Sequence, residues 1–476
     1  MAVSTKQGLL ESAYRSGEFP VQSRPEERQA AEARQKAYPY RFPRDRRQLG
    51  GKFSVQQNAE ILSRFFYFER RLAQALGSWT LSIPDFEVKL ETGRHIFYHA
   101  DAAHQLRERL TEQEMTLPKV DAYRNEEIDR FIEEMLSAAD APELLVGVHQ
   151  VAGRALDLAY AHHCDLTDPI TDAPTIRILR RIRMDYEPML EWAEQAIEAY
   201  IEGGVDESRL SVWRWHLQRL LASIGGVTGT AERAEQPSPL RSAARPYERG
   251  TVPLRDSRFT TFRHTGDYDA ADGEPRFERG SYESFRLHFI RTQRDEVDAI
   301  EAFGTFLWDI RFKDFDAEYA LARITWDEAR HTEIGHRTMQ AMGYNPFELP
   351  NRLTSSTCRG EMTGDNAAFA MAEINLFGEV SILKTINGLH DSAKLANDIL
   401  LAHDSDYIRA DERTHVRKGR HILSVMTDLG SRDLERRTRE LFTECLVSLG
   451  AVTAETLSLM QDGILSREEI EQLVGE

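Results

Sequence analysis

Apolar residues recur with a helical period over most of the chain. The pattern runs between residues 53 and 223, in stretches such as "PELLVGVHQVAGRALDLAYAHH", and it returns between residues 281 and 427. Apolar positions three or four apart predict helices that bury one face. The alternating pattern of a strand is weak throughout. The sequence therefore predicts an all-α protein.

Breaks in this pattern divide the chain into five predicted segments. The first is polar and rich in arginine, and the third is rich in glycine, proline and serine. Such compositions are typical of an irregular arm and of a linker. We therefore expect an irregular arm, a helical bundle, a linker, a second helical bundle and a helical extension, in the order 1–52, 53–223, 224–280, 281–427 and 428–476.

The second bundle contains four predicted helices. They are centred on "YESFRLHFIRTQRDEVDAIEAFGTFLWDI", "DAEYALARITWDEARHTEIGHRTMQAMGY", "DNAAFAMAEINLFGEVSILKTINGL" and "SDYIRADERTHVRKGRHILSVM". Asp316 and Ser405 are candidate N-caps of the second and fourth helices, because short polar side chains can accept the free N–H groups of a first turn.

Two of these helices carry the same short motif. Glu328 and His331 occur in "DEARH", and Glu412 and His415 occur in "DERTH". Residues three apart share one face of a helix, and here that face is otherwise apolar. A buried carboxylate and imidazole are costly unless they are paired or bind a metal. Two Glu-x-x-His helices, together with one Glu from each of two others, form the dinuclear carboxylate site of ferritin-like bundles.

The other two helices each offer two candidate carboxylates. In the third helix they are Glu373 and Glu379, and Glu379 precedes Glu412 by almost the interval that separates Glu296 from Glu328. In the first helix Glu296 lies on the apolar face, whereas the alternative, Glu301, lies about 140° away. The predicted metal ligands are therefore Glu296, Glu328, His331, Glu379, Glu412 and His415, with Glu301 as the alternative to Glu296.

An aspartate precedes the glutamate of each motif, Asp327 in one and Asp411 in the other. Each could accept the free N–H of a ligating histidine and so fix its tautomer. Carboxylates combined with imidazoles suit iron or manganese better than metals that prefer thiolates.

"DEARH" resembles the D-E-x-R-H signature of ribonucleotide reductase small subunits and bacterial multicomponent monooxygenases, which belong to the ferritin-like di-iron carboxylate superfamily. "DEVDAIE" and "DERTHV" are similar to an uncharacterised bacterial ferritin-like family. The resemblance covers residues 281–427. It implies a ferritin-like four-helix bundle with two Fe ions, or Mn in place of Fe, bridged by the catalytic residues Glu328 and Glu412. Many di-iron hydroxylases carry Thr one turn after the third-helix Glu, where this chain has Leu383, which argues against oxygen activation in the style of methane hydroxylases.

The function implied is that of an oxygenase or oxidase, for example a monooxygenase, with O2 as co-substrate and a small molecule as substrate. Hydroxylation, N-oxygenation, desaturation and C–C cleavage all remain open. Ferrous iron must be regenerated, so we expect an electron donor such as a ferredoxin or reductase, or a peroxide shunt. The alternatives are an iron-handling protein, such as a ferroxidase, a storage protein or a manganese catalase, and a metal-free scaffold.

The first bundle reads as a degenerate copy of the second. Four short stretches align in the same order: "FERRLAQALG" with "DEVDAIEAFG", "ETGRH" with "DEARH", "VAGRALDL" with "LFGEVSIL", and "TIRILRRIRM" with "YIRADERTHV". This alignment puts Glu69 over Glu296, His95 over His331 and Arg154 over Glu379.

Most ligand positions have lost their donors in this copy: Thr92 replaces Glu328, and Arg180 and Arg183 replace Glu412 and His415. Arginine does not deprotonate, so it cannot bind a metal. We expect no metal in this half and expect an arginine to pair with Glu69, so that the half serves packing, entrance shaping or homodimer formation. A less favoured alternative is a different metal site among His95, His99, His104, His162 and His163.

Charge narrows the range of partners. The net charge is −18 and the sequence pI is about 5.4. Nucleic acid needs a basic footprint and anionic membranes attract basic segments, so we expect neither as a partner. The sequence contains three cysteines and shows neither a long apolar run nor the pattern of a secretory signal, so we expect a cytoplasmic protein.

Overall fold

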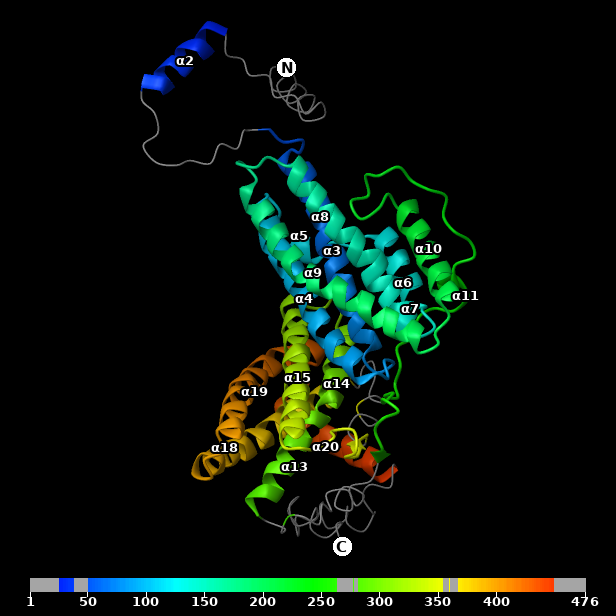
Figure 1. Cartoon of the computed structure of the whole chain (residues 1–476), viewed down its shortest axis with the longest axis vertical. Helices are drawn as coiled ribbons and strands as arrows, with labels where there is room; N and C mark the ends of the chain where they lie inside the picture. Colours follow the sequence, from blue (N-terminus) through cyan, green and yellow to red (C-terminus); the bar gives the residue numbers. More distant parts are fainter. Residues whose placement is uncertain are drawn as a thin grey trace. The chain divides into compact units, whose positions relative to one another are not determined.

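The computed structural model is all-α, as predicted (Figure 1). It describes residues 25–37, 50–262, 277, 281–353, 359 and 367–448. The strands within these ranges are two residues long and form one parallel pair, Thr261–Phe262 (β1) with Asn351–Arg352 (β2). None of the helices in the described part of the chain combines the length and hydrophobicity needed to cross a membrane.

The chain divides into two compact units, and each is described by itself. Unit 1 comprises Met1–Phe68, Ala102–Ile128 and Val146–Pro237, and the remaining segments form unit 2. Three helices, α3 (Val55–Trp79), α4 (Phe86–Thr111) and α6 (Glu126–Leu136), pass from one unit into the other. The boundaries of these units therefore differ from the predicted boundary between two bundles, a linker at residues 224–280. That domain division stays a prediction.

Unit 1 is built around an internal π-helical segment. This segment, η1 (Val146–Gly153), contacts the three helices that follow it, α8, α9 and α10. The other elements of the unit, besides parts of α3, α4 and α6 (Glu126–Leu136), are α2 (Pro25–Ala37), α5 (Leu117–Asp121), α8 (Arg154–Leu166), α9 (Ala173–Glu202) and α10 (Glu207–Ser223). Aromatic rings fill the core: Phe65 meets Tyr160 edge to face with ring centroids 4.9 Å apart, and Tyr160 meets Tyr186 in the same way.

One helix lies within the predicted irregular arm. The helix α2 spans Pro25–Ala37, so the prediction of an irregular structure is wrong for these residues. Its first turn contains Glu26 and Glu27, and its last turn contains Arg34 and Lys36. This order of charges complements the helix dipole and favours a helix that lacks an apolar face. The rest of segment 1–49 lies outside the described residues.

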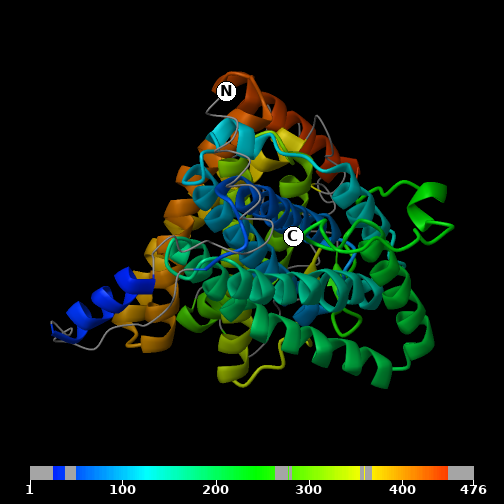
Figure 2. The same cartoon turned by 90° about the horizontal axis from the view of Figure 1, so that it is seen from above.

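Unit 2 contains the four predicted helices of the second bundle. The first is interrupted and forms α13 (Tyr282–Asp295) and α14 (Val297–Asp309), and the second is α15 (Phe315–Ala341). The third consists of α17 (Ala367–Ala372), η3 (Glu373–Gly378) and α18 (Glu379–Leu395), and the fourth is α19 (Ile399–Met426). The helix α15 packs against α13, α14 and α19, and α18 packs against α19 (Figures 1 and 2).

Further helices belong to unit 2. Besides parts of α3 and α4, they are α6 (shared with unit 1), α7 (Ala141–Leu145), α11 (Arg241–Ala244) and α20 (Ser431–Ser448). The helix α20 begins the predicted helical extension, and residues 449–476 lie outside the described part.

The caps of two bundle helices differ from the prediction. Asp314 is the N-cap of α15, and its carboxylate accepts the N–H of Ala317 at 2.7 Å. Asp398 caps α19 by accepting the N–H of Leu401. The predicted caps, Asp316 and Ser405, lie inside these helices, because an earlier aspartate was available to start each one.

Two of the bundle helices depart from regular geometry beside predicted ligands. Glu296 is the junction residue between α13 and α14 and has ψ near 1°. Glu379 is the first α-helical residue after the π-helical η3. Local π segments are frequent at functional sites, because the extra residue changes which side chains face the neighbouring helix.

Candidate metal centre

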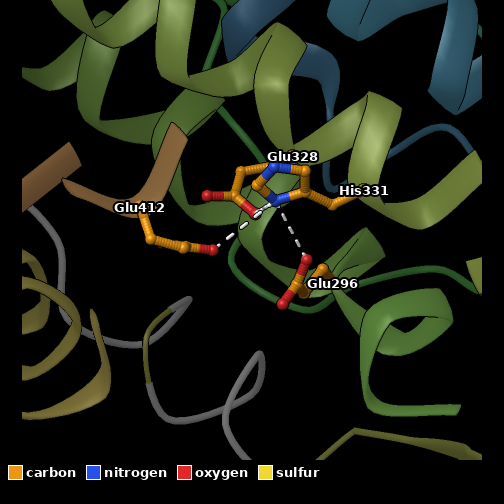
Figure 3. A group of neighbouring side chains, drawn as sticks. All are labelled: Glu296, Glu328, His331 and Glu412. Carbon is orange, nitrogen blue, oxygen red and sulfur yellow. Dashed lines mark ion pairs between the residues drawn. The ribbon is translucent and has the colours of Figure 1, made fainter. Parts of the chain in front are cut away.

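All of the predicted ligands converge between the four bundle helices. Two groups of side chains each bring their ligand atoms within 4.8 Å of one another. The first group is Glu296, Glu328, His331 and Glu412 (Figure 3). The second group is Glu328, Glu379, Glu412 and His415. Because Glu328 and Glu412 belong to both groups, each group could hold one cation while these carboxylates bridge the pair.

The cluster is withdrawn from solvent. Glu328 and Glu412 are each 2% exposed, and His331 is fully buried. Glu296 is the most accessible member, with 14% of its side chain exposed. Carboxylates at this depth are costly to keep charged without a cation or a proton nearby.

Both imidazoles direct Nδ1 into the cluster. His331 Nδ1 lies 3.3 Å from a Glu296 oxygen and 3.5 Å from an oxygen of Glu412. His415 Nδ1 lies 3.1 Å from Glu328 and 3.8 Å from Glu379. The Nδ1 atoms are therefore the ring nitrogens placed to bind cations.

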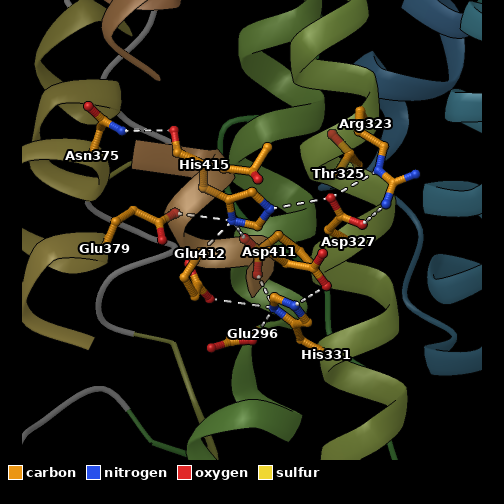
Figure 4. Close-up of polar contacts among 12 residues, drawn as sticks. Glu296, Arg323, Thr325, Asp327, His331, Asn375, Glu379, Asp411, Glu412 and His415 are labelled. Carbon is orange, nitrogen blue, oxygen red and sulfur yellow. Dashed lines mark hydrogen bonds and ion pairs between the residues drawn. The ribbon is translucent and has the colours of Figure 1, made fainter. Parts of the chain in front are cut away.

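The opposite ring nitrogens face the aspartates of the two motifs, in a crossed arrangement (Figure 4). His331 Nε2 lies 3.3 Å from Asp411 Oδ2, and His415 Nε2 lies 3.4 Å from Asp327 Oδ2. Each aspartate thus contacts the histidine of the other helix. An N–H donated from Nε2 to the carboxylate leaves Nδ1 with its lone pair toward the cluster.

One guanidinium joins the two aspartates. Arg330 Nη1 donates to Asp327 Oδ1 at 2.6 Å and to Asp411 Oδ2 at 3.1 Å. Arg323 also donates to Asp327. Burial raises the pKa of Asp327, but its hydrogen bonds with His415 and Arg323 outweigh burial and hold that pKa well below its ordinary range. The sequence analysis did not assign a role to Arg330, although this residue is the Arg of the quoted motif "DEARH".

Burial favours the protonated form of two of the four carboxylates, Glu296 and Glu379. Burial, together with the charges of Glu328 and Glu412, raises the pKa of Glu296 to about 8 against the effect of His331. Burial and the adjacent Glu412 raise the pKa of Glu379 well above its ordinary value. Burial would also raise the pKa of Glu412, but the interactions with Glu379 and His415 lower it.

The pKa values of His331 and His415 are raised, although burial alone would lower them. Burial lowers the pKa of each imidazole, but the contact of His331 with Asp411 and that of His415 with Asp327 raise both pKa values well above 6.5. Metal ligands must be deprotonated, so a divalent cation would take the place of these protons.

Several buried atoms in the cluster fit such a cation. His331 Nδ1 lies 3.3 Å from Glu296 Oε2, and His415 Nδ1 lies 3.3 Å from Glu412 Oε2, but these four atoms make no hydrogen bond of regular geometry. Buried polar atoms in folded proteins are normally hydrogen-bonded, so buried atoms that point at a common space without such bonds are suited to a ligand. Four carboxylates and two imidazoles form the donor set of a dinuclear iron or manganese site.

The structure places the two alternative carboxylates elsewhere. Glu301 is fully buried and forms ion pairs with Lys89 and Arg255. Glu373 accepts from Arg359 at 2.8 Å. Neither belongs to the clusters, so the geometry favours Glu296 over Glu301 and Glu379 over Glu373.

The first half offers no comparable group among its described residues, since both candidate groups come entirely from the second bundle. Arg154 pairs with Glu194, and Arg183 pairs with Asp157 at 2.7 Å. The side chains of Arg154 and Arg183 are 47% and 39% exposed. Exposed arginines find surface carboxylates, which explains why these partners differ from the predicted pairing with Glu69.

The buried polar residues of the first half have other partners. Glu69 Oε2 contacts His99 Nδ1 at 2.6 Å, and the Thr92 hydroxyl donates to the Val88 carbonyl. His163 stacks on the ring of Phe53, and burial lowers its pKa to about 4. These contacts show that the residues pack and form hydrogen bonds within the core of the protein.

Comparisons of the chain with protein-family models, curated proteins and solved structures find no match. The argument for function therefore rests on the chemistry of the site, because a helical fold alone does not specify an activity.

Proposed function

We propose that this chain is a dinuclear non-haem iron, or mixed manganese and iron, oxidoreductase that uses O2 to oxidise a small molecule. The observation that carries the proposal is the sharing of Glu328 and Glu412 between two groups of ligand atoms. A single-cation site needs no shared carboxylates, whereas a dinuclear site does. The bound metals would supply reversible electron transfer to dioxygen.

The protein residues have separable tasks in this proposal. Glu328 and Glu412, which belong to both groups, would contribute to holding both cations, and each histidine would bind through Nδ1. Glu296 and Glu379 would complete the two groups. Glu296 lies at the junction of α13 and α14, where its N–H donates to the carbonyl of Gln293, three residues earlier instead of four.

The surroundings of the cluster favour chemistry that must be protected from water. The shared carboxylates and both histidines are at most 2% exposed. Fixed dipoles and charges act more strongly in such an environment than they do in water. The aspartates, which Arg330 joins, would keep the imidazoles oriented toward the cluster. The reaction cycle also needs electrons, so a ferredoxin or reductase is the expected partner.

We further propose a ferritin-like bundle at residues 281–427 and a degenerate copy of it at residues 53–223. The π-helical segments support this relationship. The segment η1 ends at Gly153 and α8 begins at Arg154, while η3 ends at Gly378 and α18 begins at Glu379. The sequence alignment pairs these positions, so both halves change from π to α geometry at the same aligned residue.

Contacts within unit 2 give a second line of support. An ideal Cβ on Gly77 would lie 2.7 Å from the Gly304 carbonyl oxygen, and one on Gly304 would lie 3.0 Å from that of Gly77. An ideal Cβ on Gly93 would lie 2.9 Å from the Cβ of Ala329. Each of these pairs consists of aligned residues. Contacts between equivalent residues are characteristic of a two-fold interface, and here both copies belong to one chain.

Anaerobic loading with ferrous iron tests the proposed function. We expect two irons per chain, and fewer in Glu328→Ala and Glu412→Ala variants. Exposure of the loaded protein to O2 with a reductant should then consume O2 in a manner that depends on added substrate. Accumulation of ferric mineral would indicate iron handling instead, and the absence of bound metal would indicate a scaffold.

A further inference from the structure

Each Glu-x-x-His helix carries a glycine one turn after its histidine. Gly335 follows His331 on α15, and Gly419 follows His415 on α19. Residues four apart share a helix face, so both glycines lie on the side of the cluster. The metal ligands themselves do not explain why both positions lack a side chain.

Gly335 lies against the backbone of the neighbouring helix. An ideal Cβ at this position would be 2.3 Å from the Arg294 nitrogen and 2.8 Å from the Ile290 carbonyl oxygen, closer than real Cβ atoms approach. Arg294 comes just before Glu296 and is fully buried. Its guanidinium donates to backbone carbonyls, including those of Leu349 and Pro350, each at 2.8 Å. The end of α13 is therefore held in place and cannot retreat easily.

Gly419 has the corresponding place in the other half of the cluster. An ideal Cβ there would be 1.9 Å from Asn375 Nδ2. Asn375 belongs to η3, is 2% exposed, and donates to the His415 carbonyl at 3.3 Å. It lies one turn before Glu379. The amide thus occupies the space that a side chain at Gly419 would need, and it connects the helix of Glu379 to that of His415.

Such close contacts are not a general property of helical glycines in this bundle. An ideal Cβ on Gly388 in α18 meets nothing within 4 Å, and one on Gly378 comes no closer than 3.8 Å to another atom. Gly304 in α14 is also tightly packed, but against Gly77 and Thr80 rather than against another bundle helix. Close contacts between two bundle helices occur, among these glycines, at Gly335 and Gly419 on the helices that carry the Glu-x-x-His motifs. In both cases the neighbouring segment leads to the carboxylate that belongs to one group alone, which we call the terminal carboxylate: Glu296 in the first group and Glu379 in the second.

We infer that Gly335 and Gly419 are positioning residues, each of which sets how closely one terminal carboxylate approaches its metal position. Gly335 serves Glu296 and the first group, and Gly419 serves Glu379 and the second group through Asn375. This inference rests on the proposed di-metal function for its effect on metal binding, although the helix spacing itself is independent of any metal.

The two glycines differ in the neighbour that a methyl group would displace. At Gly335 the obstacle is main chain, so Gly335→Ala must move the end of α13 and Glu296 with it. At Gly419 the obstacle is one side chain, so Gly419→Ala can be accommodated if Asn375 turns away from His415. Alanine is a better helix former than glycine, so a loss in either variant cannot be assigned to helix propensity.

The test uses the full chain loaded anaerobically with manganese(II), with bound metal and the electron paramagnetic resonance spectrum as readouts. We expect two coupled ions in the wild type and in the control Gly388→Ala. Gly335→Ala should bind about one uncoupled ion and should retain it when Glu296 is also replaced by alanine. Gly419→Ala should likewise lose one ion, the one associated with Glu379. This selectivity distinguishes positioning from general destabilisation.

A second substitution keeps the inference falsifiable if one variant folds poorly. Asn375→Ala removes the group that a Cβ at position 419 would meet, so Gly419→Ala should have little further effect in that background. Two coupled ions in both single glycine variants would overturn the inference, as would equal losses in Gly388→Ala.

Failure of the proposed function has a different signature. A wild-type chain that binds no manganese or iron would refute the di-metal proposal. The spacing would then be judged from thermal unfolding of the metal-free protein. Gly335→Ala should lower the unfolding midpoint while Gly388→Ala does not, and equal midpoints for these variants would overturn the spacing as well.

Discussion

His331 on α15 faces Asp411 on α19, with 3.3 Å between Nε2 and Oδ2, rather than the aspartate of its own motif. His415 makes the reciprocal contact with Asp327 at 3.4 Å. The crossed contacts tie the two motif helices together at the depth of the cluster. They also explain why both motifs begin with Asp: each aspartate orients the imidazole of its partner helix.

Replacing these aspartates should weaken metal binding in a selective way. An amide that presents its NH2 group to Nε2 no longer favours the tautomer with Nδ1 free. We expect Asp411→Asn to weaken manganese(II) binding at the group containing His331, and Asp327→Asn to weaken the other group. Losses of outer partners typically reduce metal affinity about 10- to 100-fold. Anaerobic titration monitored by electron paramagnetic resonance measures each step.

The exposed residue Asp406 on α19 provides a control for this comparison. It pairs with Arg409 and lies away from the histidines. Asp406→Asn should therefore bind manganese(II) as the wild type does. Unchanged titrations for both Asp327→Asn and Asp411→Asn would show that the crossed contacts do not support metal binding.

Glu296 and Glu301 should give opposite results when each is replaced by alanine. Glu296→Ala removes a carboxylate of the first group and should abolish the magnetic coupling between two bound metals. Glu301→Ala should keep the coupling but destabilise the fold, because Lys89 and Arg255 lose their shared buried partner. Breaking a buried ion pair typically costs about 3–5 kcal/mol.

Spectroscopy of the loaded protein and urea unfolding of the metal-free protein separate these effects. Loss of coupling in Glu301→Ala with full coupling in Glu296→Ala would reverse the assignment of the ligand. A Glu301→Gln variant adds a milder comparison, since it keeps the shape of the side chain while removing its charge.

The sequence was sufficient to predict the bundle helices and the members of the cluster. Periodicity located the helices, and the repeated motif placed Glu328 and Glu412 on otherwise apolar faces. The choice of Glu296 followed from the same reasoning, because a carboxylate in the middle of an apolar face needs a partner. The structure brings all of these side chains together.

Other features could not be predicted because they depend on geometry that periodicity does not encode. The π-helical η3 ends immediately before Glu379 and gives the third helix a register that a uniform helical wheel cannot reproduce. Arg154 aligns with Glu379, yet it lies at the surface and pairs with Glu194. The crossing of the aspartates and the role of Arg330 depend on how two helices face each other, which becomes visible only in three dimensions.

The contact between Gly77 and Gly304 predicts that the aligned helices tolerate no side chain between them. Gly77→Ala and Gly304→Ala should each lower the free energy of unfolding. A Cβ at position 77 would lie 2.7 Å from the Gly304 carbonyl oxygen, and one at position 304 would lie 3.0 Å from the Gly77 carbonyl oxygen and 2.6 Å from the Thr80 side chain. Overpacking of this kind typically costs about 1–3 kcal/mol. Urea unfolding measures the loss, and Gly388→Ala is the matched control.

The double variant at these positions gives a further test. Once one methyl group has separated the helices, the second should add little, so the effects should be less than additive. Strict additivity would mean that the two glycines do not share one contact, and it would remove this support for an internal two-fold relationship.

The buried amine of Lys89 should increase the free energy of unfolding at alkaline pH. Burial, only partly offset by Glu301, lowers the pKa of this fully buried amine from 10.5 to about 8. Below pH 8 the amine is protonated in both the folded and the unfolded chain. Between about pH 8 and 10.5 the unfolded chain binds more protons at this residue, so the free energy of unfolding rises with pH, by at most about 1.4 kcal/mol per unit.

A Lys89→Met variant isolates this contribution from the other groups that titrate at alkaline pH. It lacks the buried amine while keeping a long apolar side chain, and Arg255 still faces Glu301. The wild type should gain stability relative to Lys89→Met as the pH increases from 8 to 10, as measured by urea unfolding at each pH. If the difference between the two proteins stayed constant or shrank over this range, the amine would not titrate in the window that its burial implies. The ion pair with Glu301 would then dominate over burial, and this part of unit 2 would be stabilised by a permanently charged lysine.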